Sequence, residues 1–192
     1  MKKWMLFALA LLAAGMVSAA ALQQEQRELS EKLIRLHVVA NSDSQEDQAI
    51  KIQVRDAVLA AADGLEEGQL ETALPEIQQA AEACLRQLGR EETVTVSLGM
   101  ERFPTRMYDS FSLPAGTYRA LRVTIGEGAG KNWWCVVFPS LCFRATAAEL
   151  EEAAVSAGFT TDEVRLITGD GEGYILKFKV LEWLAQVKER LF

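Results

Sequence analysis

The aromatic-rich stretch at residues 103–143 constrains the fold of this chain most strongly. Its 41 residues hold eight of the fifteen aromatic residues, three of the four prolines and two of the three cysteines. Short runs with the composition of β-strands alternate there with turn residues, and so few residues cannot bury all of these large side chains among themselves. The stretch is therefore predicted to be either the hairpin core of a sheet or a surface that contacts a partner.

Two strands and a long loop are predicted within this stretch. Residues 118–125 alternate apolar and polar side chains, and residues 133–138 are apolar and aromatic. The intervening residues 126–132 are rich in glycine, which is typical of a turn, so the two strands are predicted to pair as a hairpin. Residues 102–115 contain two prolines and are predicted to form a long irregular loop, a kind of segment that is often functional.

The rest of the chain alternates between helical and strand periodicity. Ser44 and Asp47 have the spacing of a helix N-cap, and Asp47 and Lys51 are spaced to pair on the outer face of that helix. We expect strands at residues 33–40, 93–100, 118–125, 133–138, 163–168 and 174–178, and helices at 44–64, 73–88, 146–158 and 180–191. This order favours an α+β domain with a mixed or antiparallel sheet packed with amphipathic helices.

The N-terminal segment has the pattern of an export signal. Two lysines precede an apolar run at residues 4–17, which ends in small residues of the kind that a signal peptidase cleaves after. Residues 1–21 are thus a signal peptide or a membrane anchor, because the run approaches the roughly 20 apolar residues that span a bilayer. With a polar lead-in at residues 22–32, we expect an exported protein that touches the membrane only through its N-terminal segment.

The remaining residues, 33–192, are long enough for a single domain with its own core. Without the two N-terminal lysines, 18 basic residues stand against 27 acidic residues, which gives a formal net charge of −9. Such an acidic balance makes nucleic acid and anionic membrane surfaces poor partners, because both carry negative charge themselves.

No catalytic or cofactor-binding pattern stands out in the sequence. The glycine-rich turn before Lys131 lacks the first glycine and the final hydroxyl of a phosphate-binding loop, and a strand rather than a helix is predicted after it. The single histidine, His37, is not accompanied by a Gly-x-Ser-x-Gly nucleophile motif. We therefore expect no enzyme activity, no metal ion and no cofactor.

Four polar residues lie where the first predicted strand enters the first predicted helix. They are His37, Asn41, Asp43 and Asp56. Two interpretations of this polar cluster stay open. It can be a metal or acid–base centre, or it can be an Asx turn and helix cap beside a hydrogen-bonded histidine.

Three cysteines allow at most one internal disulfide. Cys135 and Cys142 flank a short stretch that contains Pro139. In an exported protein a disulfide can close this small loop, although two cysteines on a strand can also point apart. Cys84 lies in an apolar helical stripe and is expected to be a buried thiol.

Two adjacent tryptophans, Trp133 and Trp134, must face opposite sides of the sheet if they lie on a strand. One of them can enter the core, and the other is either covered by a helix or exposed. An exposed tryptophan near arginine and tyrosine has the composition of a binding hot spot. Arg106, Tyr108 and Asp109 on the predicted loop are the candidate neighbours, so these five residues are the candidate partner contacts.

Two long segments resemble the stage II sporulation protein R family. They are LIRLHVVANSDSQEDQAIKIQVRDAVL at residues 33–59 and FPTRMYDSFSLPAGTYRALRVTIGEGAGKNWWCVVFPSLCF at residues 103–143. Together with the N-terminal signal they cover most of the domain. A small departure is Ser140, which stands where the family pattern leads us to expect a second proline.

The resemblance implies a role in communication between cells. Members of that family are made in the forespore of an endospore-forming bacterium and exported into the space between the forespore and mother-cell membranes. There they trigger a membrane-embedded aspartic protease of the mother cell, stage II sporulation protein GA, which removes the pro-segment of sigma-E. The resemblance thus implies a signal that acts by binding. The alternative is an exported metal- or carboxylate-dependent enzyme that acts on cell wall at the septum.

Overall fold

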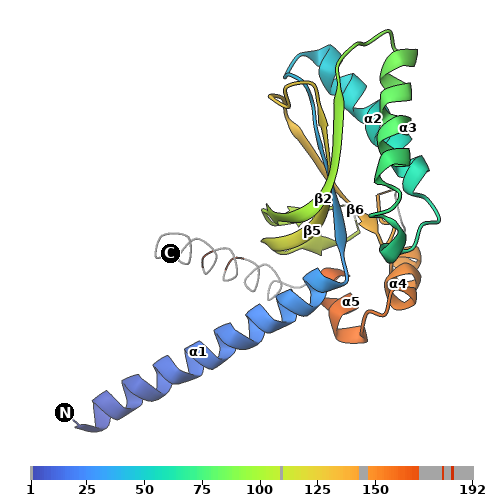
Figure 1. Cartoon of the computed structure of the whole chain (residues 1–192). Coiled ribbons are helices and arrows are strands. Elements are labelled where there is room, and N and C mark those ends of the chain that lie inside the picture. Colours follow the sequence, from blue (N-terminus) through green and yellow to red (C-terminus); the bar gives the residue numbers. More distant parts are fainter. Residues whose placement is uncertain (1, 109, 143–146, 169–178, 180–182, 184–192) are drawn as a thin grey trace.

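The computed structural model describes residues 2–108, 110–142, 147–168, 179 and 183. The elements follow one another in the order α1 (Lys2–Glu31), β1 (Ile34–Val39), α2 (Gln45–Ala62), the short 3-10 helix η1 (Glu67–Gln69), α3 (Leu74–Gln87), β2 (Val94–Phe103), β3 (Arg106–Met107), β4 (Ser112–Leu113), β5 (Gly116–Ile125), β6 (Asn132–Phe138), α4 (Ala147–Ser156) and α5 (Thr161–Thr168). Helices flank a central sheet, as Figure 1 shows.

The central sheet has the strand order β2-β5-β1-β6 and is mixed. β1 runs parallel to β5 and antiparallel to β6. β2 and β5 pair antiparallel along their whole lengths, from Val94 opposite Ile125 to Phe103 opposite Gly116. A sheet with both kinds of pairing and with helices packed against it confirms the expected α+β class.

The predicted hairpin between residues 118–125 and 133–138 is wrong. Both segments are strands, but β1 lies between them and hydrogen-bonds to each. All six residues of β1 are buried, as expected of a central strand that is covered on both faces. The glycine-rich turn therefore crosses the end of β1, a distance of about 10 Å for two strand spacings.

One face of the sheet is covered by α2 and α3, which lie side by side in Figure 1. Apolar residues at helical spacing on these helices meet apolar residues that alternate along the strands. This first core includes Ile50, Val54 and Val58 of α2, Ile77, Ala81 and Leu85 of α3, and Leu36, Val38, Leu121 and Val123 of the sheet.

The expected outer-face pair of Asp47 and Lys51 on α2 is wrong, because both side chains are buried. The Lys51 ammonium donates to Gln48 Oε1 at 2.6 Å and to the Lys131 carbonyl at 3.0 Å. Burial lowers the pKa of Lys51. The two residues thus lie inside the contact between α2 and its neighbouring loops.

The opposite face of the sheet carries a second core towards the end where α1, α4 and α5 gather (Figure 1). It includes Leu29 of α1, Leu113 of β4, Leu150 of α4 and Ile167 of α5, packed with Tyr118 and Val136 of the sheet. α1 reaches this core with its last turns and otherwise extends away from the domain. Among the described residues, no helix is both long and apolar enough to cross a membrane.

The strand predicted at residues 163–168 is wrong, since these residues belong to α5. The Thr160 N–H donates to the Glu163 carboxylate at 2.6 Å, and the Glu163 N–H donates to the Thr160 hydroxyl at 3.3 Å. This capping box begins the helix and outweighs the strand-like composition. The paired strand expected at 174–178 and the cap expected at Thr146 lie outside the described residues, as does almost all of the terminal helix.

Candidate functional site

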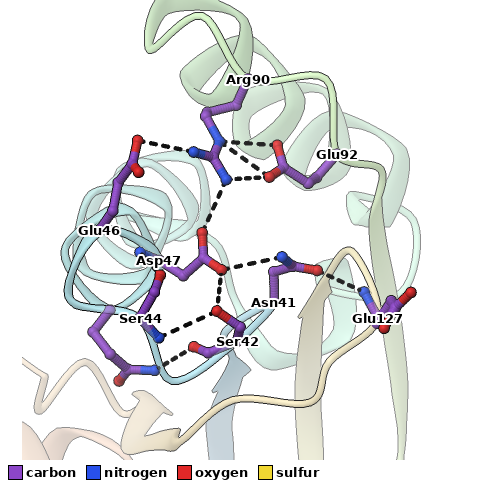
Figure 2. A network of polar contacts seen from close by, with 9 residues as sticks. Asn41, Ser42, Ser44, Glu46, Asp47, Arg90, Glu92 and Glu127 are labelled. Carbon is purple, nitrogen blue, oxygen red and sulfur yellow. Dashed lines mark hydrogen bonds and ion pairs between the residues drawn. The ribbon is translucent and has the colours of Figure 1, made fainter.

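A network of polar contacts centred on Asp47 joins the end of β1 to the start of α2 (Figure 2). The Asp47 carboxylate accepts hydrogen bonds from the Ser42 hydroxyl at 2.6 Å and from the Asn41 amide at 3.1 Å. The Asp47 N–H donates to the Ser44 hydroxyl at 3.0 Å, which confirms Ser44 as the N-cap of α2. Asn41, Ser42 and Ser44 thus fold back onto the first turn of the helix.

Arg90 ties this Asp47 network to the connection between α3 and β2. Its guanidinium donates to Asp47 at 2.9 Å and to Glu46 at 2.9 Å, and it also pairs with Glu92. The hydrogen bond from Ser42 is the main cause that lowers the pKa of Asp47, against the opposing effect of burial. The hydrogen bond from Arg90 likewise lowers the pKa of Glu92. Since each of these charges has a partner, we interpret the network as structural. It holds together the end of β1, the start of α2 and the connection between α3 and β2.

The turn between β5 and β6 packs on the same network. The Gly130 N–H donates to the Ala40 carbonyl at 2.9 Å. The Lys131 N–H donates to the Asp43 carboxylate at 2.7 Å. A Cβ atom at Gly130 would overlap the Ser42 carbonyl, so this close approach of two backbones requires glycine. The glycine-rich turn is therefore a packing device at the end of β1.

The structure does not gather the predicted polar cluster at one place. His37 points to the face of the sheet opposite α2 and α3. There its ring nitrogens contact Glu101 at 2.7 Å and Asn132 at 2.8 Å. Asp56 lies on α2, on the other side of the sheet. In the parts of the chain that the structure describes, no group of three or more His, Cys, Asp or Glu side chains could hold a metal ion.

Arg35 is fully buried on the same face as His37, with 0% of its surface exposed. Its guanidinium lies 4.1 Å from the ring centre of Phe103 and 5.0 Å from that of Tyr118. Its Nη2 donates to the Tyr108 hydroxyl at 3.0 Å. Within the described residues, Nε and Nη1 have no hydrogen-bond partner. No ion pair among the described residues involves Arg35, and a buried charge is costly in free energy unless it is paired, so the contacts described do not explain this arginine by stability alone.

Aromatic rings continue from Arg35 across the sheet. Phe103 meets Tyr118 edge to face at 5.9 Å, and His37 lies 6.1 Å from Phe103 and stacks on Trp134 at 5.6 Å. The Tyr118 hydroxyl donates to a backbone carbonyl at 2.7 Å. Burial raises the pKa of Tyr118 to about 12, and the nearby Arg35 opposes that rise. Tyr118 is therefore neutral at physiological pH.

The two tryptophans of β6 lie on opposite faces of the sheet and each stacks with an arginine. Trp133 packs on the first core, with the Arg55 guanidinium 4.5 Å from its ring centre. Trp134 packs on the second core, with the Arg106 guanidinium at 3.7 Å. Arg55 also pairs with Asp56 at 2.6 Å, whereas the buried Nε of Arg106 has no hydrogen-bond partner among the described residues.

A short hairpin, β3 with β4, brings Arg106 and Tyr108 onto this face. The predicted irregular loop at residues 102–115 is therefore wrong in part. The Tyr108 N–H donates to the Phe111 carbonyl at 2.8 Å, and the two rings stack at 4.4 Å. Asp109, which was also a candidate contact, lies outside the described residues.

Seven residues form what we name the arginine–aromatic cluster: Arg35, His37, Phe103, Arg106, Tyr108, Tyr118 and Trp134. Of the candidate contacts, the structure brings Arg106, Tyr108 and Trp134 together here and places Trp133 on the other face. Arg35 was not among the residues predicted from the sequence to form a site. The signal was an arginine inside an apolar run whose residues all belong to one buried strand.

Cys135 and Cys142 are joined in a disulfide, with their Cα atoms 5.4 Å apart. The bond ties β6 to the segment that follows it. Cys84 is a free thiol that is half-buried rather than buried, and burial raises its pKa. A raised pKa keeps the thiol protonated and makes it a poor nucleophile.

The fold is an α+β domain with a mixed sheet, and the arginine–aromatic cluster lies on the face of that sheet opposite α2 and α3. Residues 30–148 match the family model described as Stage II sporulation protein R. The Stage II sporulation protein R of Bacillus subtilis (strain 168) is 31% identical to this chain, and the match covers 83% of each of the two chains. The chain therefore belongs to the stage II sporulation protein R family, and the resemblance seen in the sequence is confirmed. No solved structure matches it.

Proposed function

We propose that this protein is an exported sporulation signal that activates a membrane-embedded aspartic protease of the mother cell, stage II sporulation protein GA. The activated protease then processes pro-sigma-E. The signal acts by binding, in the space between the forespore and mother-cell membranes. Membership of the stage II sporulation protein R family is the observation that carries this proposal.

Activation by binding requires that the protein binds the active state of the protease more tightly than the inactive state. Shifting such an equilibrium from 1:99 to 99:1 takes about 5.5 kcal/mol of differential binding. A few hot-spot residues, each contributing about 2 kcal/mol or more, can supply that difference. The activator needs a contact surface with such residues and no catalytic group of its own.

The arginine–aromatic cluster supplies residues of the required kind. Arg106, Tyr108 and Trp134 belong to the residue types that dominate binding hot spots, and each is half-buried at the rim of the cluster. Met107, between two of them on the hairpin, is 76% exposed. These observations support the hairpin β3–β4 and Trp134 as the part of the surface that meets the protease.

Reconstitution tests this function. The protease and its pro-sigma-E substrate are placed in lipid vesicles, and cleavage is followed with and without the full chain. We expect cleavage to depend on the added chain. The variant Arg106→Glu should reduce the cleavage rate at least tenfold, whereas the control Arg86→Glu, on the exposed side of α3, should not. Cleavage that proceeds equally without the chain would refute the proposed function.

Export is tested separately from activation. Residues 1–21 are proposed to direct export as a signal peptide or to stay as an anchor, and sequencing the N-terminus of the mature protein distinguishes the two. A new N-terminus just after residue 19 or 21 supports cleavage, and a retained Met1 supports anchoring. Protein found only in the forespore cytoplasm would contradict both.

A further inference from the structure

We propose that the arginine–aromatic cluster is a binding site for a carboxylate side chain, presented by an acidic segment of the partner protein. The identity of the partner rests on the proposed function. The preference for a carboxylate rests on the geometry of the cluster itself.

Arg35 provides the first observation. Two of its three guanidinium nitrogens lack a hydrogen-bond partner within the described chain, although the side chain is completely buried. Its third nitrogen donates to the hydroxyl of Tyr108. The guanidinium of arginine can donate two parallel hydrogen bonds to a planar group with two oxygens. A hydroxyl oxygen accepts only one of them. The guanidinium is therefore held in place, and no carboxylate among the described residues pairs with it.

Arg106 provides a second cation at the same cluster. It lies over the ring of Trp134, and its buried Nε also lacks a partner among the described residues. A nearby carboxylate, that of Glu101, already accepts from His37 and from Arg122, each at 2.7 Å. Glu101 is thus engaged by two other side chains. No ion pair within the described part of the chain involves Arg35 or Arg106, so both cations can pair with an external anion.

The hairpin β3–β4 packs over Arg35. It lays the Tyr108 hydroxyl on Arg35 and the Arg106 guanidinium on Trp134. Each of its strands has two residues, and such a short pair adds little stability of its own. A small displacement of the hairpin lets a ligand oxygen replace the Tyr108 hydroxyl at Arg35, with Arg106 closing on the same ligand from the rim.

A carboxylate fits this site better than a phosphate. A carboxylate is planar, carries one negative charge and matches the fork of one guanidinium. A phosphate group carries between one and two charges at neutral pH, and moving it into a buried aromatic site costs more desolvation free energy. Because the buried part of the site offers the single charge of Arg35, the monoanion is the better complement.

Titration of the isotope-labelled full chain tests the inference directly. The probe is the blocked dipeptide N-acetyl-Glu-Glu-amide, with N-acetyl-Gln-Gln-amide and inorganic phosphate as comparison ligands. The readout is the indole N–H resonances of Trp134 and Trp133, which lie on opposite faces of β6. We expect saturable shifts at Trp134 with the glutamate probe, no shift at Trp133, and at least tenfold weaker binding of the glutamine dipeptide and of phosphate.

Variants locate the site and make the test decisive. Arg35→Met and Arg106→Gln should each weaken binding of the glutamate probe at least fivefold, and Arg55→Gln should not change it. Tyr108→Phe removes the competing hydroxyl from Arg35 and should tighten binding severalfold. The Arg106 and Tyr108 variants alter the rim and keep the test informative if Arg35→Met fails to fold.

Several outcomes overturn the inference. They are the absence of saturable binding, binding that is equal for the two dipeptides, tighter binding of phosphate, and binding that survives both arginine substitutions. Binding that appears only in Asp109→Asn also overturns it, since the chain's own carboxylate would then be the ligand. The test does not involve the protease, so failure here leaves the proposed function standing. Failure of reconstitution leaves the carboxylate site standing.

Discussion

Two buried charged residues on opposite sides of this sheet, Asp47 and Arg35, differ in how many of their polar atoms have partners. Asp47, beside the face that α2 and α3 cover, receives hydrogen bonds from Ser42 and Asn41 and an ion pair from Arg90. Arg35, on the other face, receives one hydroxyl contact and two aromatic rings, and two of its nitrogens lack partners in the described chain. Asp47 is compensated within the protein, whereas no ion pair in the described part of the chain compensates Arg35.

The difference separates structural from functional use of charge. A buried charge with partners fixes the geometry of its neighbours. Removing one partner leaves the remaining buried polar groups unpaired, which costs a large desolvation free energy. An uncompensated buried charge lowers stability, so its removal need not harm the fold. Binding sites are commonly less stable than the scaffold that carries them. The four predictions below test whether the two regions differ in this way.

The largest expected effect follows from Asp47→Ala. The substitution leaves Arg90, Ser42 and Asn41 without their shared acceptor, so the free energy of unfolding should fall by about 3 kcal/mol or more. Urea denaturation monitored by circular dichroism measures the change. Glu46→Ala is the matched control, because Glu46 touches the same arginine but is largely exposed, and it should cost less than about 0.5 kcal/mol. Equal losses in the two variants would show that burial of Asp47 is unimportant.

Acidification should produce a related but smaller loss. The pKa values of Asp47 and Glu92 are lowered in the folded protein, by the Ser42 hydrogen bond and by the Arg90 hydrogen bond respectively. Depressed carboxyl pKa values stabilise the fold above the unfolded values of 3.8 and 4.5, and this stabilisation is lost as pH falls through the lower folded values. Unfolding free energy should therefore decrease below about pH 4.5.

Asp47→Asn isolates the contribution of Asp47 to this pH dependence. The asparagine can still accept hydrogen bonds but does not titrate, so its unfolding free energy should fall less steeply between pH 5 and pH 3 than that of the wild type. The measurement is urea denaturation at pH 5, 4 and 3. An unchanged slope would mean that other carboxylates dominate acid unfolding.

Sequence reasoning predicted most of the elements but not how they are arranged. The strands at residues 33–40, 93–100, 118–125 and 133–138 and the N-cap at Ser44 follow from local periodicity and capping chemistry, which a sequence displays directly. The insertion of β1 between β5 and β6 is a long-range pairing. Its only local trace is that β1 is apolar on both faces, a pattern that also fits other strand orders.

The candidate site was predicted in part for a similar reason. Arg106, Tyr108 and Trp134 stood out because arginine and aromatic residues near a loop suggest an interface. Arg35 did not stand out, because an arginine within an apolar run usually marks the exposed end of a buried segment. Only its surroundings in the folded protein show that it is buried. His37 was grouped with Asp43 and Asp56 by nearness in sequence, whereas strand alternation turns it to the opposite face.

The next prediction concerns Arg35→Met. Methionine has a similar volume and no charge, so it removes the uncompensated cation while keeping contact with the two rings. The favourable cation–π contacts and one hydrogen bond are lost as well, which leaves the unfolding free energy unchanged or raised by about 1 kcal/mol. Urea denaturation again gives the value. A loss above about 2 kcal/mol would show that Arg35 is a structural residue like Asp47.

The smallest change in stability is expected for a matched pair of arginines on the two faces, Arg55 and Arg106. Each stacks on one tryptophan of β6, at 4.5 Å and 3.7 Å respectively, and is substituted by glutamine. Loss of a partly exposed cation–π contact should cost each variant less than about 1 kcal/mol. Thermal unfolding of the two variants should therefore be nearly the same, although Arg55 also gives up its pair with Asp56.

Function should separate this pair even though stability does not. Arg55 is paired with Asp56 on the face that α2 and α3 cover, so Arg55→Gln should leave protease activation as it is in the wild type. Arg106 lies over Trp134 at the rim of the arginine–aromatic cluster and has no ion pair among the described residues, so Arg106→Gln should slow pro-sigma-E processing severalfold in the reconstituted system. Equal processing by both variants would place the contact surface elsewhere. Equal loss in both would mean that tryptophan stacking, rather than uncompensated charge, is what the partner requires.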